Sequence, residues 1–259
     1  MLTEIESPPA AAAPPRPAAP APEDKRRYVH RLFTQIAPRY DWFNRLGSFG
    51  LDRRWRRAAV AQAGLGAGHR VLDVCAGTGD VSLLAARRHP EVGMIVGLDF
   101  TAAMLSLAQV KQRRAGAAVS WVQGDAQALP FKGATFDRVL IGFSTRNLSD
   151  LDGGLRELVR VLRPGGRLVI LETGYPRHPL VRAGYQAFLF TVARTIGFLL
   201  TGRCWPFSYL ARSVRQFLTP TQMLERLAAC ATQARYQPLS FGLASLYIAT
   251  KRTGDARHA

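Results

Sequence analysis

The residues best suited to chemistry form a small-residue turn within residues 71–80, between an apolar run and a helical pattern. Gly77 and Gly79 lack a Cβ, so the backbone there can bend sharply and lie against a ligand. The helix that follows would offer free N–H groups and a positive potential at its N-terminus. Asp99 ends the next apolar run, twenty residues after Gly79, where a carboxylate can accept from both hydroxyls of a ribose. The spacing predicts a site for a nucleoside-containing cofactor.

Two cofactor classes fit this layout, dinucleotides and S-adenosylmethionine. Ser82 occupies the position of the third glycine of the dinucleotide fingerprint. Asp73, inside the first apolar run, suits a ligand with a cationic amino group and a sulfonium better than one with a pyrophosphate. Asp125 follows the third apolar run, where it can accept from an adenine amino group. The candidate cofactor-binding residues are Asp73, Gly77, Thr78, Gly79, Asp99, Asp125, Ala126 and Gly142.

The elements around these residues alternate in type. Apolar runs at 71–75, 94–98, 119–122, 139–141 and 168–171 are separated by amphipathic stretches at 80–88, 101–114 and 151–162. Strands that alternate with helical patterns predict βαβ units and a parallel sheet. Pro164, Gly165 and Gly166 predict a sharp helix end before the fifth strand. Residues 239–250 predict a final pair of strands around Gly242.

The flanking segments have different compositions. Residues 7–22 hold seven Pro and seven Ala, which cannot bury a core, so residues 1–24 are predicted to be a disordered tail and 25–259 a single domain. An apolar helical face within residues 29–36 is predicted to end at Pro38. Residues 183–200 are the most apolar segment, but an internal Arg194 would be costly in a bilayer. That segment is predicted to be a buried or interfacial helix that covers an apolar pocket.

The composition limits the partners. The chain has 259 residues and a net charge of +17, which raises nucleic acid, an anionic membrane surface or an anionic ligand as candidates. Three cysteines without a C-x-x-C spacing give no support to a disulfide framework or a thiolate zinc site, and no metal site is expected. The sequence opens without a secretory signal pattern, and we expect a reduced, cytoplasmic protein.

Several motifs in order give the chain a family resemblance. Gly124-Asp125-Ala126 follows the third run, Phe136-Asp137 leads into the fourth, and Arg163-Pro164-Gly165-Gly166 leads into the fifth. With the glycine turn, residues 65–175 resemble a class I S-adenosylmethionine-dependent methyltransferase. This resemblance implies an α/β Rossmann-like fold, with a mostly parallel seven-stranded sheet flanked by helices and with helical N-terminal and substrate-lid additions.

The resemblance narrows over residues 28–252, which are similar to the ubiquinone/menaquinone biosynthesis C-methyltransferases. The residues that carry it are Arg39-Tyr40-Asp41-x-x-Asn44, Phe143 to Leu148, Glu172 to Pro176, Tyr209-Leu210-x-x-Ser213, Gly242 and Lys251. Some positions depart from the family pattern. Cys75 replaces a glycine, Ser144-Thr145 replaces Gly-Leu, Thr173-Gly174-Tyr175 replaces Phe-Ser-x, Tyr247 replaces His, and an Ala-Gly-Phe run is absent near residues 231–234.

This resemblance implies methylation of a ring carbon on a reduced, prenylated quinone. Arg146 would stabilise a developing phenolate or position a water that takes the proton, and Asn147 and Tyr40 would orient the ring hydroxyls. The favoured substrate is a naphthoquinol of the menaquinone route (demethylmenaquinol to menaquinol). The alternative is the benzoquinol of the ubiquinone route, a 2-methoxy-6-polyprenyl-1,4-benzoquinol.

Partners follow from that substrate. Prenylated quinols reside in the bilayer, so the basic aromatic N-terminal region and residues 183–200 predict peripheral contact with an anionic membrane, at the inner face of the cytoplasmic membrane. Nucleic acid is not an expected partner, because no known RNA-binding module accompanies the charge. An RNA methyltransferase and a non-enzymatic S-adenosylmethionine-binding protein stay open as rival hypotheses.

Overall fold

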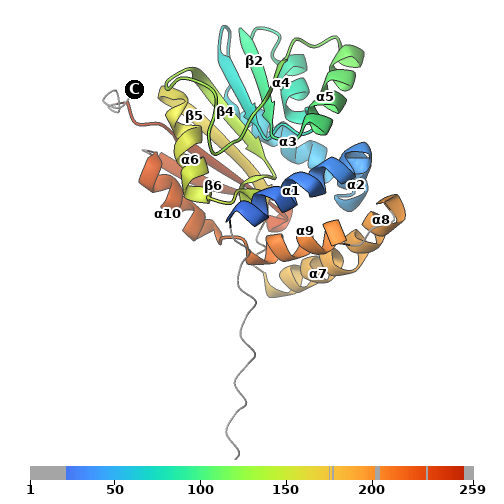
Figure 1. Cartoon of the computed structure of the whole chain (residues 1–259). Coiled ribbons are helices and arrows are strands. Elements are labelled where there is room, and N and C mark those ends of the chain that lie inside the picture. The colour runs from blue at the N-terminus through green and yellow to red at the C-terminus, as the bar shows by residue number, and fades with distance from the viewer. Residues whose placement is uncertain (1–21, 175, 177, 202–204, 232, 254–259) are drawn as a thin grey trace, which may run out of the picture.

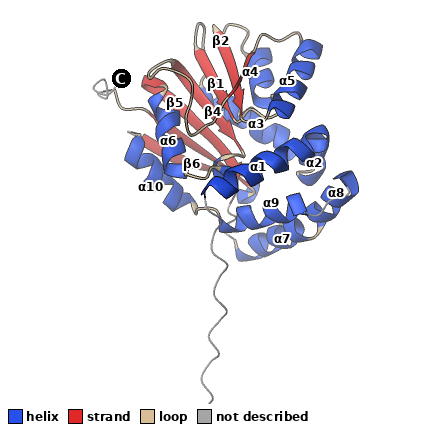
Figure 2. Ribbon diagram, viewed as in Figure 1, coloured by secondary structure: helices blue, strands red, loops and turns tan. Residues whose placement is uncertain are grey.

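A single twisted sheet organises the described part of the chain, which in this computed structural model comprises residues 22–174, 176, 178–201, 205–231 and 233–253. Within these residues seven strands pair in the order β3-β2-β1-β4-β5-β7-β6 (Figures 1 and 2). β1 to β5 are parallel, and β7 lies antiparallel between β5 and β6. The strands are β1 Arg70–Val74, β2 Met94–Asp99, β3 Ser120–Gln123, β4 Phe136–Gly142, β5 Leu162–Thr173, β6 Gln233–Leu239 and β7 Ala244–Thr250.

Helices cover both faces of the sheet, as buried parallel strands require. α6 (Leu151–Arg160) and α10 (Pro220–Cys230) pack on one face, where Leu72 and Val74 of β1 point. α3 (Leu51–Ala63) and α4 (Asp80–Arg88) pack on the other, where Val71 points. α5 (Ala102–Ala115) connects β2 to β3. The predicted α/β fold with a mostly parallel sheet is confirmed.

A layer of helices lies beyond the carboxyl ends of the parallel strands (Figure 1). It contains α1 (Pro22–Ile36), a 3-10 turn η1 (Ala37–Arg39), α2 (Tyr40–Gly47), α7 (Pro179–Phe190), α8 (Val192–Thr201) and α9 (Trp205–Gln216). Phe43 of α2 and Ala211 of α9 are buried at the centre of its small apolar core. α1 ends before Pro38, as expected. Residues 1–21 of the predicted tail lie outside the described residues, and residues 22–24 belong to α1.

Two predicted elements differ from the structure. The helix expected over 151–162 ends at Arg160, and β5 already begins at Leu162, so Pro164-Gly165-Gly166 lies within the bounds of the strand. Lys251 holds this junction, because its Nζ donates to the carbonyl oxygens of Arg160 and Leu162. The helix expected over 183–200 is two helices that break at Thr191, and several of its side chains are exposed.

The end of β5 lies tightly against the turn between β6 and β7. The Gly174 N–H donates to the Leu243 carbonyl oxygen at 2.9 Å. A Cβ on Gly174 would overlap the Gly242 carbonyl oxygen and lie 2.6 Å from the Ala244 nitrogen. Trp55 of α3 fixes the same turn, because its Nε1 donates to Ser240 Oγ at 2.9 Å. Only glycine at position 174 permits this approach.

We therefore expect Gly174→Ala to lower the free energy of unfolding by about 2 kcal/mol or more, because the clash is with backbone that cannot rotate away. Gly184→Ala is the control. Gly184 lies in α7 with nothing within 4 Å of an added Cβ, so alanine should raise stability by about 0.5 kcal/mol. Urea denaturation measures both. Equal stability of the two variants would contradict the close approach.

Candidate active site

The glycine turn after β1 is folded as the cofactor prediction requires. Cys75 and Gly77 both have φ near +56°, and the Ala76 N–H donates to the Leu98 carbonyl oxygen. The Gly77 N–H donates to Asp99 Oδ2 at 2.8 Å. Gly79 has φ +83°, and a Cβ there would lie 2.6 Å from the Trp121 ring. Gly77 thus brings the backbone to Asp99, whereas Gly79 is needed for packing under β3.

Asp99 lies at the carboxyl end of β2, buried against the same turn. Its Oδ1 accepts from the Thr101 N–H at 2.8 Å, which together with the Gly77 bond fixes the carboxylate. Burial raises the pKa of Asp99, against the opposing effect of these two backbone donors. The carboxylate is held rigidly at the edge of a pocket.

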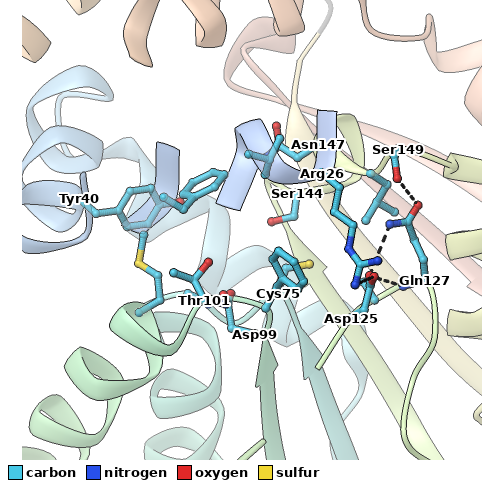
Figure 3. A pocket seen from close by; sticks show the side chains of 17 residues that line it. Arg26, Tyr40, Cys75, Asp99, Thr101, Asp125, Gln127, Ser144, Asn147 and Ser149 are labelled. Carbon is cyan, nitrogen blue, oxygen red and sulfur yellow. Dashed lines mark hydrogen bonds and ion pairs between the residues drawn. The ribbon is translucent and has the colours of Figure 1, made fainter. Parts of the chain in front are cut away.

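That pocket, the cofactor pocket, encloses about 690 Å³ including its open mouth. Figure 3 shows its side chains, which come from α1, α2, the glycine turn, the start of α5, the ends of β2 and β3 and the loop after β4. Asp125 accepts from Arg26 of α1 at 2.9 Å and from the Gln127 N–H at 2.9 Å. The lining residues are Arg26, Val29, Phe33, Tyr40, Cys75, Gly77, Asp99, Phe100, Thr101, Met104, Asp125, Ala126, Gln127, Ser144, Asn147, Leu148 and Ser149.

The side chains that line this pocket fit an adenosine-containing methyl donor. Asp99 offers an acceptor beside a glycine that admits a ligand to the backbone, Asp125 offers a second acceptor, and Met104 and Phe100 supply apolar surface between them. Of the predicted cofactor residues, the structure brings Gly77, Asp99, Asp125 and Ala126 to this pocket.

The other four predicted cofactor residues lie around the pocket rather than on its wall. Asp73 points to the α4 face, where its Oδ2 accepts from the Ser82 N–H at 3.0 Å and from the Ser82 hydroxyl. The Thr78 hydroxyl donates to Asp41 Oδ1 at 2.6 Å. Gly142 ends β4, and its carbonyl oxygen accepts from Ser144 Oγ. Gly79, as described above, packs under Trp121. Asp73 thus contacts Ser82 and does not line the pocket, and its role toward a cationic amino group stays a prediction.

A second pocket, the aromatic pocket, adjoins the first. It encloses about 940 Å³ including its mouth. Phe33, Tyr40 and Asn147 line both pockets and so form the wall between them. Its remaining lining residues are Leu32, Ile36, Phe43, Asn44, Gly47, Ser48, Asp52, Trp55, Arg56, Phe143, Arg146, Thr173, Tyr185, Phe188, Tyr209 and Leu210. All three predicted catalytic residues, Arg146, Asn147 and Tyr40, are among them.

Arg146 and Asn147 lie in the 3-10 turn η2 (Thr145–Asn147) after β4. Arg146 is buried, ion-pairs with Glu172 of β5, and donates from Nη1 to the Phe143 carbonyl oxygen at 2.7 Å. Burial alone would lower the pKa of Arg146, but the Glu172 carboxylate outweighs it and holds that pKa above its usual value. Asn147 Oδ1 accepts from the Tyr209 hydroxyl at 3.1 Å. Among the described residues, neither Arg146 Nε nor Asn147 Nδ2 has a hydrogen-bond partner.

Sequence reasoning missed several residues of the two pockets. Arg26, Thr101 and Ser144 line the cofactor pocket, and Trp55 and Tyr185 line the aromatic one. Burial raises the pKa of Tyr185 to about 12, so its hydroxyl stays protonated at neutral pH. One signal was available for Glu172, which was noted only as part of a family motif. A charged residue directly after the apolar run 168–171 must find a partner where parallel strands end.

Comparison with known families matches residues 21–251 to the family described as ubiE/COQ5 methyltransferases. The chain belongs to this family. It is 41% identical to a demethylmenaquinone methyltransferase of Deinococcus radiodurans, over 92% of this chain and 98% of that protein. It is 39% identical to the ubiquinone/menaquinone biosynthesis C-methyltransferase UbiE of Geobacter sulfurreducens, over 88% of this chain and 90% of that protein.

A solved structure shares the fold. It is the phosphoethanolamine N-methyltransferase 2 of Haemonchus contortus, in complex with phosphomonomethylethanolamine and S-adenosylhomocysteine.

The match to the Haemonchus contortus enzyme has a TM-score of 0.61 and 16% sequence identity, and it covers 88% of this chain and 60% of that one. A likeness at this level of identity shows the fold alone. Together with the family match it confirms the expected class, an S-adenosylmethionine-dependent methyltransferase with a Rossmann-like fold.

The buried position of Asp73 predicts a pH effect on stability. Burial raises the pKa of Asp73 to about 7 from 3.8. Below about pH 4 the carboxyl is protonated in the folded and unfolded chains alike. As the pH rises toward 7 only the unfolded chain ionises, so this contribution to the free energy of unfolding is lost.

Asp73→Asn cannot ionise and keeps a polar group beside Ser82. We expect its free energy of unfolding, relative to the parent chain, to improve between pH 4 and pH 8. Urea denaturation at four pH values across this window measures the difference. A difference that is the same at every pH would contradict the raised pKa.

Proposed function

We propose that this chain methylates a ring carbon of demethylmenaquinol, a reduced prenylated naphthoquinone, with S-adenosylmethionine as methyl donor. The observation that carries the proposal is the shared wall of Phe33, Tyr40 and Asn147 between a pocket suited to adenosine and an aromatic pocket. The two pockets adjoin at these residues, so a methyl donor in one would lie next to an aromatic ring in the other. The names of the Deinococcus and Geobacter relatives support the quinol substrate.

On the cofactor side, Asp99 would accept from the ribose hydroxyls and Asp125 from the adenine amino group. S-adenosylmethionine, when bound, supplies an electrophilic methyl group, so no metal is required. The Gly77 backbone would lie against the ligand because no Cβ intervenes. Arg26 now holds Asp125, so its side chain would share or release that carboxylate when an adenine binds.

On the substrate side, the aromatic pocket would hold the quinol ring. Trp55, Phe143 and Phe188 supply flat apolar surface, which suits two fused rings. Arg56 lies over the Phe143 ring, 5.7 Å from its centroid, and is neutralised by Asp52. The pocket thus offers aromatic surface to the ring, and Arg146 and Asn147 bring it two unpaired donors.

Arg146 and Asn147 would act on the ring oxygen. Their unpaired Nε and Nδ2 groups can donate to a quinolate, which lowers the pKa of the quinol hydroxyl and raises electron density at the neighbouring carbon. The hydroxyl proton leaves to water. The ring carbon then forms its bond to the methyl group as the carbon–sulfur bond breaks, and the ring proton is lost as aromaticity returns. Tyr40 would orient the second hydroxyl from the shared wall.

Methyl transfer from labelled S-adenosylmethionine tests the proposal. We expect turnover of reduced demethylmenaquinol in detergent, none of the oxidised quinone, and less of the demethylated ubiquinol precursor. Arg146→Ala should lower kcat by about 100-fold, because it removes a donor to the developing anion. Arg156→Ala, an exposed arginine on α6, is the control and should keep full activity.

Three results would count against this assignment. Preference for the benzoquinol would move the substrate to the ubiquinone route. Methylation of RNA alone would favour the rival that the net charge of +17 suggests. An Arg146→Ala variant as active as the control would remove Arg146 from the reaction.

We also propose peripheral docking on an anionic membrane through an apolar tip, defined as Trp42, Leu46, Phe49, Phe190, Val192, Phe198 and Leu199. Phe49 and Leu199 are 78% and 76% exposed. The ring centroids of Phe49 and Phe188 lie 5.7 Å apart, and Phe188 lines the aromatic pocket. The tip therefore adjoins that pocket. Exposed Arg45, Arg53 and Arg54 flank the tip. Among the described residues, no helix has the length and apolar character to cross a bilayer.

Cosedimentation with phosphatidylglycerol liposomes at low salt tests this docking. We expect binding by the parent chain and a loss of at least tenfold in Phe49→Ser/Leu199→Ser and in Arg53→Glu/Arg54→Glu, since each arginine near the surface contributes about 1 kcal/mol. Arg156→Glu on α6, on the opposite face of the sheet from α3, is the matched charge control. Equal binding by all variants would exclude the tip.

A further inference from the structure

Arg146 and Asn147, the two residues with an unpaired buried donor, each bond to a side chain from a distant element. Arg146 is held by Glu172, at the end of β5, and Asn147 is held by Tyr209, in α9. Neither partner was predicted as a site residue. The contacts of Glu172 and Tyr209 show what these two side chains can do for the site.

Glu172 is fully buried, and its carboxylate is saturated. Its Oε2 accepts from Thr145 Oγ1 at 2.7 Å and from the Arg146 N–H at 3.3 Å. Its Oε1 accepts from Arg146 Nη1, from the Thr173 N–H at 2.7 Å and from Thr173 Oγ1 at 3.1 Å. With both oxygens occupied, Glu172 has no position left from which to take a proton from substrate. Its contacts hold another group.

Two of those donors are threonine hydroxyls, one from Thr145 in the η2 turn and one from Thr173 at the end of β5. Both threonine hydroxyls point at Glu172. The two hydroxyls thus add donors to one carboxylate and help to fix its orientation.

The consequence for Arg146 is a fixed guanidinium. Its Nη1 donates to both Glu172 and the Phe143 carbonyl oxygen, so the plane cannot turn without losing both contacts. Arg146 lines the aromatic pocket, and its buried Nε has no hydrogen-bond partner among the described residues. Glu172 therefore determines which edge of the guanidinium is available to a ligand.

Tyr209 does the same for Asn147. Its hydroxyl donates to Oδ1 at 3.1 Å, which leaves the buried Nδ2 as the unpaired end of the amide. The Tyr209 ring packs against Tyr28 of α1 with centroids 5.2 Å apart. Burial raises the pKa of Tyr209, so the hydroxyl remains a donor at neutral pH.

We propose that Glu172 and Tyr209 are positioning residues that fix the Arg146 guanidinium and the Asn147 amide as hydrogen-bond donors to a phenolate oxygen in the aromatic pocket, which both residues line. The inference rests on the proposed function for its substrate, a quinol, but its chemistry is that of any aromatic hydroxyl in the pocket.

The test uses three variants with matched controls. Tyr209→Phe removes one hydroxyl, and Thr145→Val removes one donor to Glu172 while Thr145→Ser keeps it. Glu172→Gln is more severe and leaves a buried cation without a counter-charge, so the two milder variants keep the inference testable if it fails to fold. Binding of S-adenosylhomocysteine checks that each variant retains the cofactor pocket.

The first readout needs no turnover. 4-Nitrophenol, titrated spectroscopically with excess protein and S-adenosylhomocysteine, should show a lowered pKa when bound to the parent chain. Tyr209→Phe and Thr145→Val should each lose part of that shift, and Thr145→Ser should keep it. Variants that all match the parent chain would overturn the positioning role, whatever the chain methylates.

The second readout is the reaction with demethylmenaquinol. Tyr209→Phe should lower kcat by about fivefold to tenfold with little change in KM, and should move the acid limb of the kcat–pH profile to higher pH. A change in KM alone, with an unmoved profile, would overturn the inference. Absence of methyl transfer in the parent chain, with the nitrophenol shift intact, would reject the proposed substrate and leave the positioning role standing.

Discussion

The buried ion pair between Arg146 and Glu172 joins the parts of this molecule that must act together. It connects the turn after β4 to the end of β5, two neighbouring parallel strands whose carboxyl ends meet at one edge. Burying two charges is costly unless their remaining hydrogen-bond donors and acceptors find partners. Backbone and threonine donors satisfy Glu172, and a carbonyl oxygen partly satisfies Arg146. The Arg146 Nε has no hydrogen-bond partner among the described residues, and the side chain lines the aromatic pocket.

The cofactor turn and the N-terminal helices are tied together by a second set of charges. Lys111 of α5 donates to Asp41 of α2 at 2.9 Å and to Thr78 of the turn at 3.1 Å, and also pairs with Asp80. α2 carries Tyr40 of the shared wall. The same helix therefore contacts the turn proposed to bind the cofactor and forms part of the pocket that would bind the ring.

α1 closes the arrangement from the other side. Lys25 donates to the carbonyl oxygens of Arg146 and Leu148, and Arg26 reaches Asp125. One helix thus contacts the turn that carries the proposed catalytic residues and the carboxylate proposed for adenine. Because these contacts are polar and partly exposed, they can exchange when ligands enter, whereas the apolar contacts of Leu32 and Ile36 keep the helix in place.

The sequence by itself determined the sheet, the turn after β1, and the positions of Asp99 and Asp125, because these depend on local patterns. Apolar runs specify strands, glycines permit the turn, and a residue at a strand end lies at a known edge. Arg146, Asn147 and Tyr40 came from a motif, and the structure places all three at one pocket.

Only the tertiary structure decided the rest. Asp73 faces α4 because side chains alternate along β1, and the partner across that face is nine residues away in Ser82. Glu172, Tyr209 and Arg26 find their partners 26, 62 and 99 residues away, and no local pattern specifies such contacts.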